Sequence, residues 1–226
     1  MNVTLGTGDG ADFWVFGFGS LIWKPDIPFE ECRDAFITGW RRRFWQHSTD
    51  HRGTESYPGR VATLVLAEQP GERCYGRAYR VDNEAAADVL AYLDEREKQG
   101  YSRLALPVYD ARSAEQITKH ALVYIAREDN PHFVRAADER QIPVLCRIIA
   151  RARGPSGDNA TYLFRLKESL DEIGVRDEHV DELVFGVRAE LEALASACSE
   201  STPHGVAVAP TAASFDAVPA SSDDLR

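Results

Sequence analysis

Three carboxylates crowd the end of a predicted helix, in the stretch YLDEREKQGY from Tyr92 to Tyr101. They belong to Asp94, Glu95 and Glu97. Acids at a helix C-terminus face the negative end of the helix dipole, and like charges this close repel one another. A carboxylate kept in such a place can have a raised pKa and serve as a general base. The plainer interpretation is a solvated, charged helix end, and spacing alone does not choose among the three acids.

A second feature is WVFGFGSLIWK, residues 14–24, where two glycines and a serine interrupt an apolar strand pattern. Glycine after a buried strand lets a ligand or another strand approach the backbone closely. Successive backbone N–H groups in such a loop can bind an anion or a developing oxyanion. A dinucleotide-binding loop would need a third glycine where Ile22 stands, and a helix after it. From the residues alone, a β-bulge or tight turn is favoured over a binding site.

The segment RRRFWQHSTDHRGTESYPGR, residues 41–60, follows a predicted strand. Ser48, Asp50 and His51 could suggest a triad or a metal site, but neighbours on one loop rarely converge. The chain also lacks the G-x-S-x-G motif of a nucleophile elbow. His47 and His51 are therefore expected to form hydrogen bonds within the loop. The four cysteines are far apart and form no C-x-x-C, so neither a zinc site nor a disulfide framework is expected.

Composition is that of an ordinary globular protein, with 226 residues, 44% of them hydrophobic and 27% charged. A formal net charge of -10 argues against nucleic acid or an anionic membrane as a partner. The N-terminus does not resemble a secretory signal and no apolar run is long enough for a membrane span, so a cytoplasmic location is expected. We expect one domain over residues 13–196, a mobile N-terminal extension over 1–12 and a disordered C-terminal tail over 197–226.

The hydrophobic periodicity predicts strands early in the chain and helices late. The predicted strands cover residues 13–18, 34–48 as one or two strands, 60–68, 73–81, 101–110 and 117–126. A helix with Asp82 or Asn83 as its N-cap is predicted over 82–97, before a stop at Gly100. Further helices are predicted over 138–153, 158–173 and 177–194. This order is typical of an α+β domain.

Four stretches together resemble the ChaC family of glutathione-specific gamma-glutamylcyclotransferases. They are VFGFGSLIWK, RRFWQHSTDHRGTESYPGRVATL, AYLDEREKQGY and GPSGDNATYLF, and they occur in this order between Phe13 and Glu192. The resemblance implies a gamma-glutamylcyclotransferase-like α+β fold, with a small mixed β-barrel-like sheet packed with helices. It also implies cleavage of glutathione to 5-oxoproline and cysteinylglycine without a metal or organic cofactor. A monomer is expected.

The resemblance also assigns roles to single residues. It makes Glu97 the catalytic acid, and it implies a substrate loop made of Val15, Phe16, Gly17, Phe18, Gly19 and Ser20. Related enzymes often have tyrosine where Phe18 stands, so no role is given to that hydroxyl. Thr161 stands where a glutamate is expected, in a helix that supports the site. Tyr162 could contact substrate, although a buried helix tyrosine is the preferred interpretation.

A gamma-glutamyl peptide contains its own nucleophile, because its α-amine can close a five-membered ring on the γ-carbonyl. Glu97 is then expected to take a proton from this amine and to protonate the leaving amine, while amides of residues 17–21 hold the γ-glutamyl part. A cation near the substrate carboxylates is expected. The candidates for it are Arg41, Arg42, Arg43 and Arg60. Two alternatives stay open: a cyclotransferase for other gamma-glutamyl amino acids or amines, and a non-catalytic regulator that binds glutathione.

Overall fold

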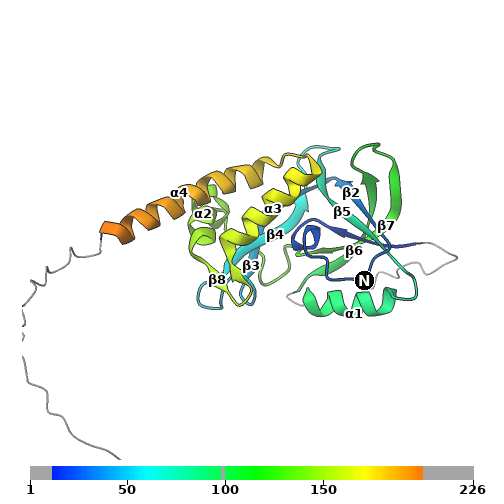
Figure 1. Cartoon of the computed structure of the whole chain (residues 1–226), viewed down its shortest axis with the longest axis horizontal. Coiled ribbons are helices and arrows are strands. Elements are labelled where there is room, and N and C mark those ends of the chain that lie inside the picture. The colour runs from blue at the N-terminus through cyan, green and yellow to red at the C-terminus, as the bar shows by residue number, and fades with distance from the viewer. Residues whose placement is uncertain (1–11, 98–99, 201–226) are drawn as a thin grey trace, which may run out of the picture.

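Five strands close into a mixed barrel at one end of the molecule (Figure 1). The computed structural model describes residues 12–97 and 100–200, with side chains up to residue 197. Neighbouring strands of the barrel are antiparallel, except that β1 and β7 meet in parallel and close it. In order around the barrel the strands are β1 (Phe13–Gly17), β5 (Arg73–Val81), β2 (Glu31–Thr38), β6 (Ser102–Asp110) and β7 (Gln116–Ile125). The predicted α+β class is confirmed.

A separate antiparallel pair, β3 (Trp40–Ser48) and β4 (Gly59–Leu66), extends away from the barrel. The predicted segment 34–48 is thus two strands, separated at Gly39, whose φ of 78° suits glycine. The strands on either side of the turn QPGE belong to different sheets, because β4 pairs with β3 whereas β5 pairs with β1 and β2. A turn signal predicts where a chain reverses but not which strands then pair.

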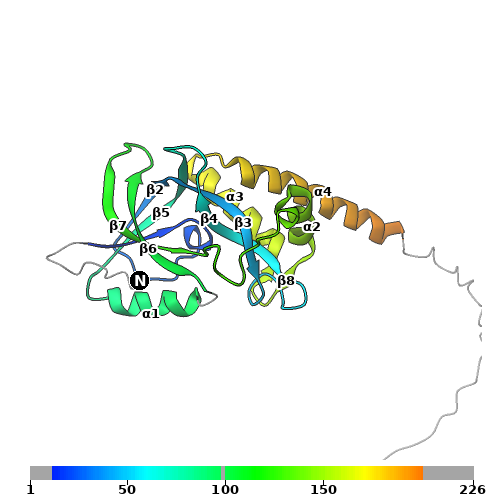
Figure 2. The same ribbon diagram turned by 180° about the vertical axis from the view of Figure 1, so that it is seen from behind.

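The four α-helices lie in two places. Helix α1 (Ala86–Arg96) lies along the barrel, and the other three gather around β3 and β4 at the opposite end of the molecule (Figures 1 and 2). They are α2 (Ile142–Arg151), α3 (Asn159–Ile173) and α4 (Glu178–Glu200). A two-residue strand pair, β8 (Arg153–Gly154) and β9 (Gly157–Asp158), connects α2 to α3 at the predicted GPSG turn. None of the described helices is both long and apolar enough to cross a membrane.

Helix boundaries differ from those predicted. Helix α1 begins at Ala86, because the Oδ1 atom of Asp82 accepts the amide of Glu84 at 2.9 Å and stabilises a turn before the helix. Asp177 caps α4 as its position suggests, since its Oδ1 accepts the amide of Val180 at 3.2 Å. Helix α4 continues to Glu200, past the expected start of the tail at 197. The expected N-terminal extension, apart from Asp12, and residues 201–226 lie outside the described residues.

Alternation along β1 divides the apolar core in two. Val15 faces Tyr79 and Leu122, in a cluster that α1 covers with Val89 and Leu93. Trp14 and Phe16 face the other way, into a larger cluster that extends to α2, α3 and α4. Successive side chains of a strand point to opposite faces. One strand therefore anchors both helical parts of the protein.

Arg42 on β3 is the most deeply buried charged residue in this frame, with 2% of its surface exposed. Its Nε atom donates to the carbonyl of Phe18 at 2.8 Å, and its terminal nitrogens donate to the carbonyl of Tyr75 and the carboxylate of Asp177. These partners lie on the loop after β1, on β5 and at the start of α4. A buried cation needs such acceptors, because desolvation alone would be strongly unfavourable.

We predict that Arg42→Met lowers the free energy of unfolding by about 3 kcal/mol, because it leaves two carbonyls and a partly buried carboxylate without their donor. Urea denaturation followed by circular dichroism measures the loss. Arg176→Met is the matched control: its side chain is 80% exposed and paired with Asp181. The control should change stability by no more than about 0.5 kcal/mol. Equal losses in the two variants would contradict the role given to Arg42.

Candidate active site

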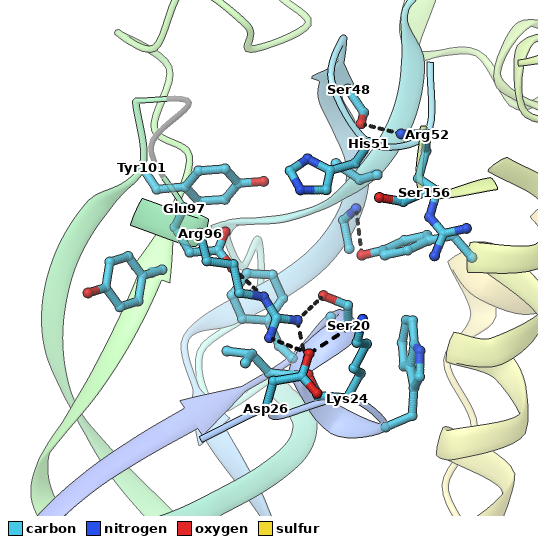
Figure 3. Close-up of a pocket in the computed structure, with 18 of the residues that line it drawn as sticks. Ser20, Lys24, Asp26, Ser48, His51, Arg52, Arg96, Glu97, Tyr101 and Ser156 are labelled. Atoms are coloured by element: carbon cyan, nitrogen blue, oxygen red, sulfur yellow. Dashed lines mark hydrogen bonds and ion pairs between the residues drawn. The ribbon is translucent and has the colours of Figure 1, made fainter. Parts of the chain in front are cut away.

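A cavity of about 300 Å³ opens between the barrel and the helical end of the molecule (Figure 3). Segments that are far apart in the sequence contribute to its walls, among them the loop after β1, the end of α1, the loop between β3 and β4, and the start of α3. Its polar and charged lining residues are Ser20, Lys24, Asp26, Ser48, His51, Arg52, Tyr92, Arg96, Glu97, Tyr101, Tyr124, Ser156 and Tyr162.

Most of the predicted substrate loop borders this cavity. Phe16, Phe18, Gly19 and Ser20 all line it. Gly17 does not line it, and Val15 is fully buried in the core beneath α1. The side chain of Val15 therefore belongs to the packing of the barrel. Gly17 shapes the loop from behind.

The loop after β1 turns tightly because glycine lets the backbone fold back on itself. A Cβ atom at Gly17 would lie 2.6 Å from the Cβ of Leu21. Ser20–Ile22 form a 3-10 turn, in which the amide of Ile22 donates to the carbonyl of Gly19 at 3.0 Å. The expected tight turn is present, and it lies at the edge of a cavity.

The carbonyls of this loop are used within the protein. That of Leu21 accepts the hydroxyl of Tyr79 at 2.7 Å, and that of Ser20 accepts the amide of Lys24 at 2.9 Å. By contrast, the amides of Gly19, Ser20 and Leu21 have no hydrogen-bond acceptor within the described part of the chain. The first N–H groups of a helical turn lack partners within that turn. They are available to a ligand.

The structure distinguishes the three acids at the end of α1. Asp94 accepts the hydroxyl of Tyr124 at 2.8 Å and pairs with Arg103 at 3.3 Å. Glu95 is exposed and does not border the cavity. Glu97 is the C-cap of α1, its side chain is 18% exposed, and it lines the cavity. Of the three, Glu97 is the one placed to meet a ligand.

Burial is the main reason why the pKa of the Glu97 carboxyl is raised above its ordinary value. The positive charges of Arg96 and His51 act in the opposite direction, whereas the negative charge of Asp50 adds to the rise. Arg96 is close, with 3.8 Å between its Nε and the Oε1 of Glu97. Burial, with a smaller contribution from Glu97, also holds the pKa of Tyr101 well above its usual range.

Arg96 connects the acid to the loop, although it was not among the site residues expected from the sequence. Its guanidinium donates to the hydroxyl of Ser20 at 3.1 Å and to the carbonyls of Pro25 and Lys24 at 3.1 and 3.0 Å. It also lies 3.7 Å from the carboxylate of Asp26 (Figure 3). Arg96 thereby holds the end of α1 against residues 20–26. Its place beside Glu97 in the REK triplet was the available signal.

Comparison with known proteins identifies the family. The family model described as "ChaC-like protein" matches residues 13–190. Gamma-glutamylcyclotransferase 2-3 of Arabidopsis thaliana is 42% identical over 177 residues, which cover 77% of this chain and 88% of the relative. The glutathione-specific gamma-glutamylcyclotransferase of Schizosaccharomyces pombe is 39% identical, covering 80% and 95%. This chain belongs to the ChaC-like family.

The fold agrees with that membership. A crystal structure of a yeast gamma-glutamyl cyclotransferase specific to glutathione matches with a TM-score of 0.73 at 29% identity. The match covers 80% of this ChaC-like chain and 97% of the yeast chain. The predicted gamma-glutamylcyclotransferase-like fold is therefore confirmed.

The loop between β3 and β4 contributes more of the cavity than its sequence suggested. His51 and Ser48 both line it, but they do not form a triad with Asp50. The Ser48 hydroxyl accepts the amide of Arg52 at 2.9 Å, and His51 Nδ1 lies 2.6 Å from Asp50. His47 is outside the cavity lining, 3.7 Å from Glu139. Within the described chain, no group of three or more His, Cys, Asp or Glu side chains could hold a metal.

The candidate cations are not those considered from the sequence. Arg41, Arg42, Arg43 and Arg60 are all absent from the lining of this ChaC-like cavity. Arg60 is directed to Glu139 instead, at 2.9 Å. Among the described residues, the cations that line the cavity are Lys24, Arg52 and Arg96. Sequence proximity could not reveal this, because the cavity forms only when distant segments meet.

Helix α3 supplies Tyr162, which is both buried and part of the cavity wall. It is 6% exposed, and its ring packs edge-on against Trp23 with the centroids 5.4 Å apart. A Cβ atom added to Gly19 would lie 3.0 Å from its hydroxyl. Thr161, the neighbouring residue, is exposed. Tyr162 therefore limits the space above the loop.

We predict that Glu97→Gln is at least as stable as the wild type at neutral pH. Because the pKa of Glu97 is raised by folding, the folded protein binds the proton more tightly than the unfolded chain. This contribution to the free energy of unfolding therefore falls as pH rises from about 4.3, the usual value for glutamate, through the raised pKa. Above that pH range the ionised Glu97 carboxylate lowers the free energy of unfolding. The uncharged amide of glutamine removes this loss. Urea unfolding at several pH values measures the difference, and a large loss of stability at pH 7 would contradict it.

Proposed function

We propose that this ChaC-like protein is a gamma-glutamylcyclotransferase that cleaves glutathione to 5-oxoproline and L-cysteinylglycine. One observation carries the proposal: Glu97, whose pKa is raised by burial, lines the same cavity as a glycine loop with free amides. The relatives named for this reaction support it. We further propose that the enzyme acts as a cytoplasmic monomer, and that it needs neither a metal nor an organic cofactor.

The reaction needs the α-amine to be held close to the γ-carbonyl, and it needs one group that carries a proton between the two nitrogens. The neutral α-amine of the γ-glutamyl part attacks its own γ-carbonyl, so a C–N bond forms and closes the five-membered ring. Glu97 takes a proton from this nitrogen and delivers it to the cysteinyl nitrogen as the old amide bond breaks. The proton lost when the substrate ammonium becomes neutral is returned to the leaving amine by solvent. No water is consumed.

The loop amides stabilise the negative charge that develops on the oxygen of the γ-carbonyl during the attack. An N–H group of Gly19, Ser20 or Leu21 that donates to the developing oxyanion contributes on the order of 3 kcal/mol. Holding the amine near the carbonyl converts binding energy into ring-closure geometry. In this proposal Phe16, Gly17, Phe18, Gly19 and Ser20 form the substrate loop, and Val15 supports it from the core. Phe18 acts through its backbone and ring, because it has no hydroxyl.

Two observations bear on the alternative functions. A pure binding protein for an acidic ligand gains nothing from a buried carboxylate at the cavity wall, since it would repel the ligand. The cavity also extends past Tyr162 to Arg52 and Ser156, which leaves space beyond the scissile bond. The first alternative, a cyclotransferase for other gamma-glutamyl compounds, is tested by comparing the turnover of glutathione with that of gamma-glutamyl-alanine. Calorimetric binding of glutathione without 5-oxoproline would indicate the regulator.

We predict that Glu97→Gln abolishes cysteinylglycine release from glutathione, with a loss of at least 100-fold in kcat, the scale of general acid–base catalysis. Glu95→Gln is the matched control, two residues away and outside the cavity, and should retain most of the activity. In the wild type, kcat/KM should fall with acid at a pH above the ordinary pKa of glutamate, because the base must be ionised. Near wild-type turnover of Glu97→Gln, or loss only in Glu95→Gln, would show that the wrong acid has been assigned.

The two loop glycines should respond differently to alanine. In Gly19→Ala the added methyl meets the end of a side chain at the cavity, so kcat/KM should fall on the order of 10- to 100-fold while stability changes little. In Gly17→Ala the methyl meets Leu21, so both stability and activity should fall, with roughly 1 to 3 kcal/mol lost. Thermal unfolding and 5-oxoproline release measure the two effects. Equal loss of stability in both variants would favour a purely structural turn.

A further inference from the structure

In the part of the chain that the structure describes, the three cations that line the cavity differ in how far other residues already pair them. Lys24 is 66% exposed and lies 3.5 Å from the carboxylate of Asp26. Arg96 binds three oxygens of residues 20–25 and also lies near two carboxylates. Arg52 forms no ion pair with any carboxylate of the described residues. Of these three cations, Arg52 is the one whose charge is not paired with a carboxylate of the described residues.

Arg52 is nevertheless held in place. Its amide donates to the Ser48 hydroxyl at 2.9 Å, and its guanidinium donates one bond, to the carbonyl of Asp158 at 3.3 Å. The guanidinium carbon lies 5.8 Å from the centroid of the Tyr162 ring. The neighbouring carbonyl of His51 accepts the amide of Ser156 at 2.9 Å, which fixes the loop against the β8–β9 hairpin. A guanidinium has five N–H donors in a rigid fork, so most of them remain for a ligand.

The electrostatics agree with a cation that lacks a full counter-charge. Burial lowers the pKa of Arg52, and the smaller opposing effects come from Tyr162 and Asp158. The carboxylate of Asp158 itself lies 3.5 Å from Arg153. A partly desolvated guanidinium in this state gains from binding an anion.

Arg52 and Glu97 lie on opposite sides of the cavity, with His51 between them (Figure 3). If the γ-carbonyl is placed at Glu97, the cysteinylglycine part must extend away from it. Two extended residues reach roughly 7 Å and end in the glycine carboxylate. Arg52 and Ser156 are among the polar groups on that side, and Arg52 is the charged one.

We propose that Arg52 binds the glycine carboxylate of glutathione and makes the cavity select glutathione over gamma-glutamyl compounds that lack a carboxylate at this position. The assignment rests on the proposed function. It adds a specificity-determining residue on the leaving-group side, distinct from the loop and the acid that act at the scissile bond.

The test compares glutathione with its glycinamide, in which the C-terminal carboxylate is an uncharged amide. The wild type should cleave the glycinamide with kcat/KM about 10- to 100-fold below that for glutathione, the scale expected for one lost charge-assisted hydrogen bond. Arg52→Gln should lose the same factor on glutathione, mainly through KM, and should no longer distinguish the two substrates. Arg52→Lys keeps the charge but not the fork, so it should recover part of the discrimination.

Three controls make the result decisive. Equal rates of Arg52→Gln and wild type on the glycinamide show that the variant is folded. Arg153→Gln, on the adjoining β8–β9 hairpin and 77% exposed, should keep full discrimination. If Arg52→Gln still discriminates, or if Lys24→Gln abolishes discrimination instead, the assignment of Arg52 is wrong while the proposed function stands. If the wild type releases no 5-oxoproline from either substrate, the proposed function fails and this assignment fails with it.

Discussion

The arrangement of this protein depends on the hydrogen bonds and the ion pair of the buried Arg42 guanidinium. Arg42 lies on β3, and its three acceptors lie on the loop after β1, on β5 and at the start of α4. Each acceptor belongs to a different part of the fold, so one side chain relates the barrel, the β3–β4 pair and the helices. Such a charge can be buried because each nitrogen of the guanidinium meets an oxygen. The need for these oxygens fixes where the carbonyl of Phe18, and with it the loop, must stand.

Close backbone contact is the second constraint on the loop. A Cβ atom at Gly76 on β5 would lie 2.1 Å from the carbonyl of Gly17, so β5 and the end of β1 approach each other there without a side chain between them. Gly17 in turn leaves space for Leu21 when the chain reverses. The loop carbonyls bind the body of the protein, and three amides are left over. The glycines of the WVFGFGSLIWK stretch are thus explained by the approach of the protein's own backbone as well as by space at the cavity.

The charged residues in and around the cavity differ in how far each is buried and paired. Asp94 and Arg103 pair with each other outside the cavity lining, and Arg96 is occupied by oxygens of the loop. Glu97 is left partly desolvated, with opposing effects from Arg96, His51 and Asp50. Similar residue types therefore have different chemistry here, because each is buried and paired to a different extent. The position of Glu97 as C-cap of α1 places the acid at the end of the helix that borders the cavity.

The order and type of most elements can be predicted from the sequence, because the periods of strand and helix are local properties of the chain. Through its motifs the sequence also indicated Glu97 and most of the glycine loop, and the family comparison confirmed the resemblance. Only the tertiary structure showed that Val15 faces the core, that β4 and β5 belong to different sheets, and that Arg52 and Arg96 rather than Arg41, Arg42, Arg43 or Arg60 face the cavity. Which way a side chain points depends on strand register and on how the barrel closes. The partners of a charge depend on segments as distant as Ser20 and Arg96, which meet only when the whole chain has folded.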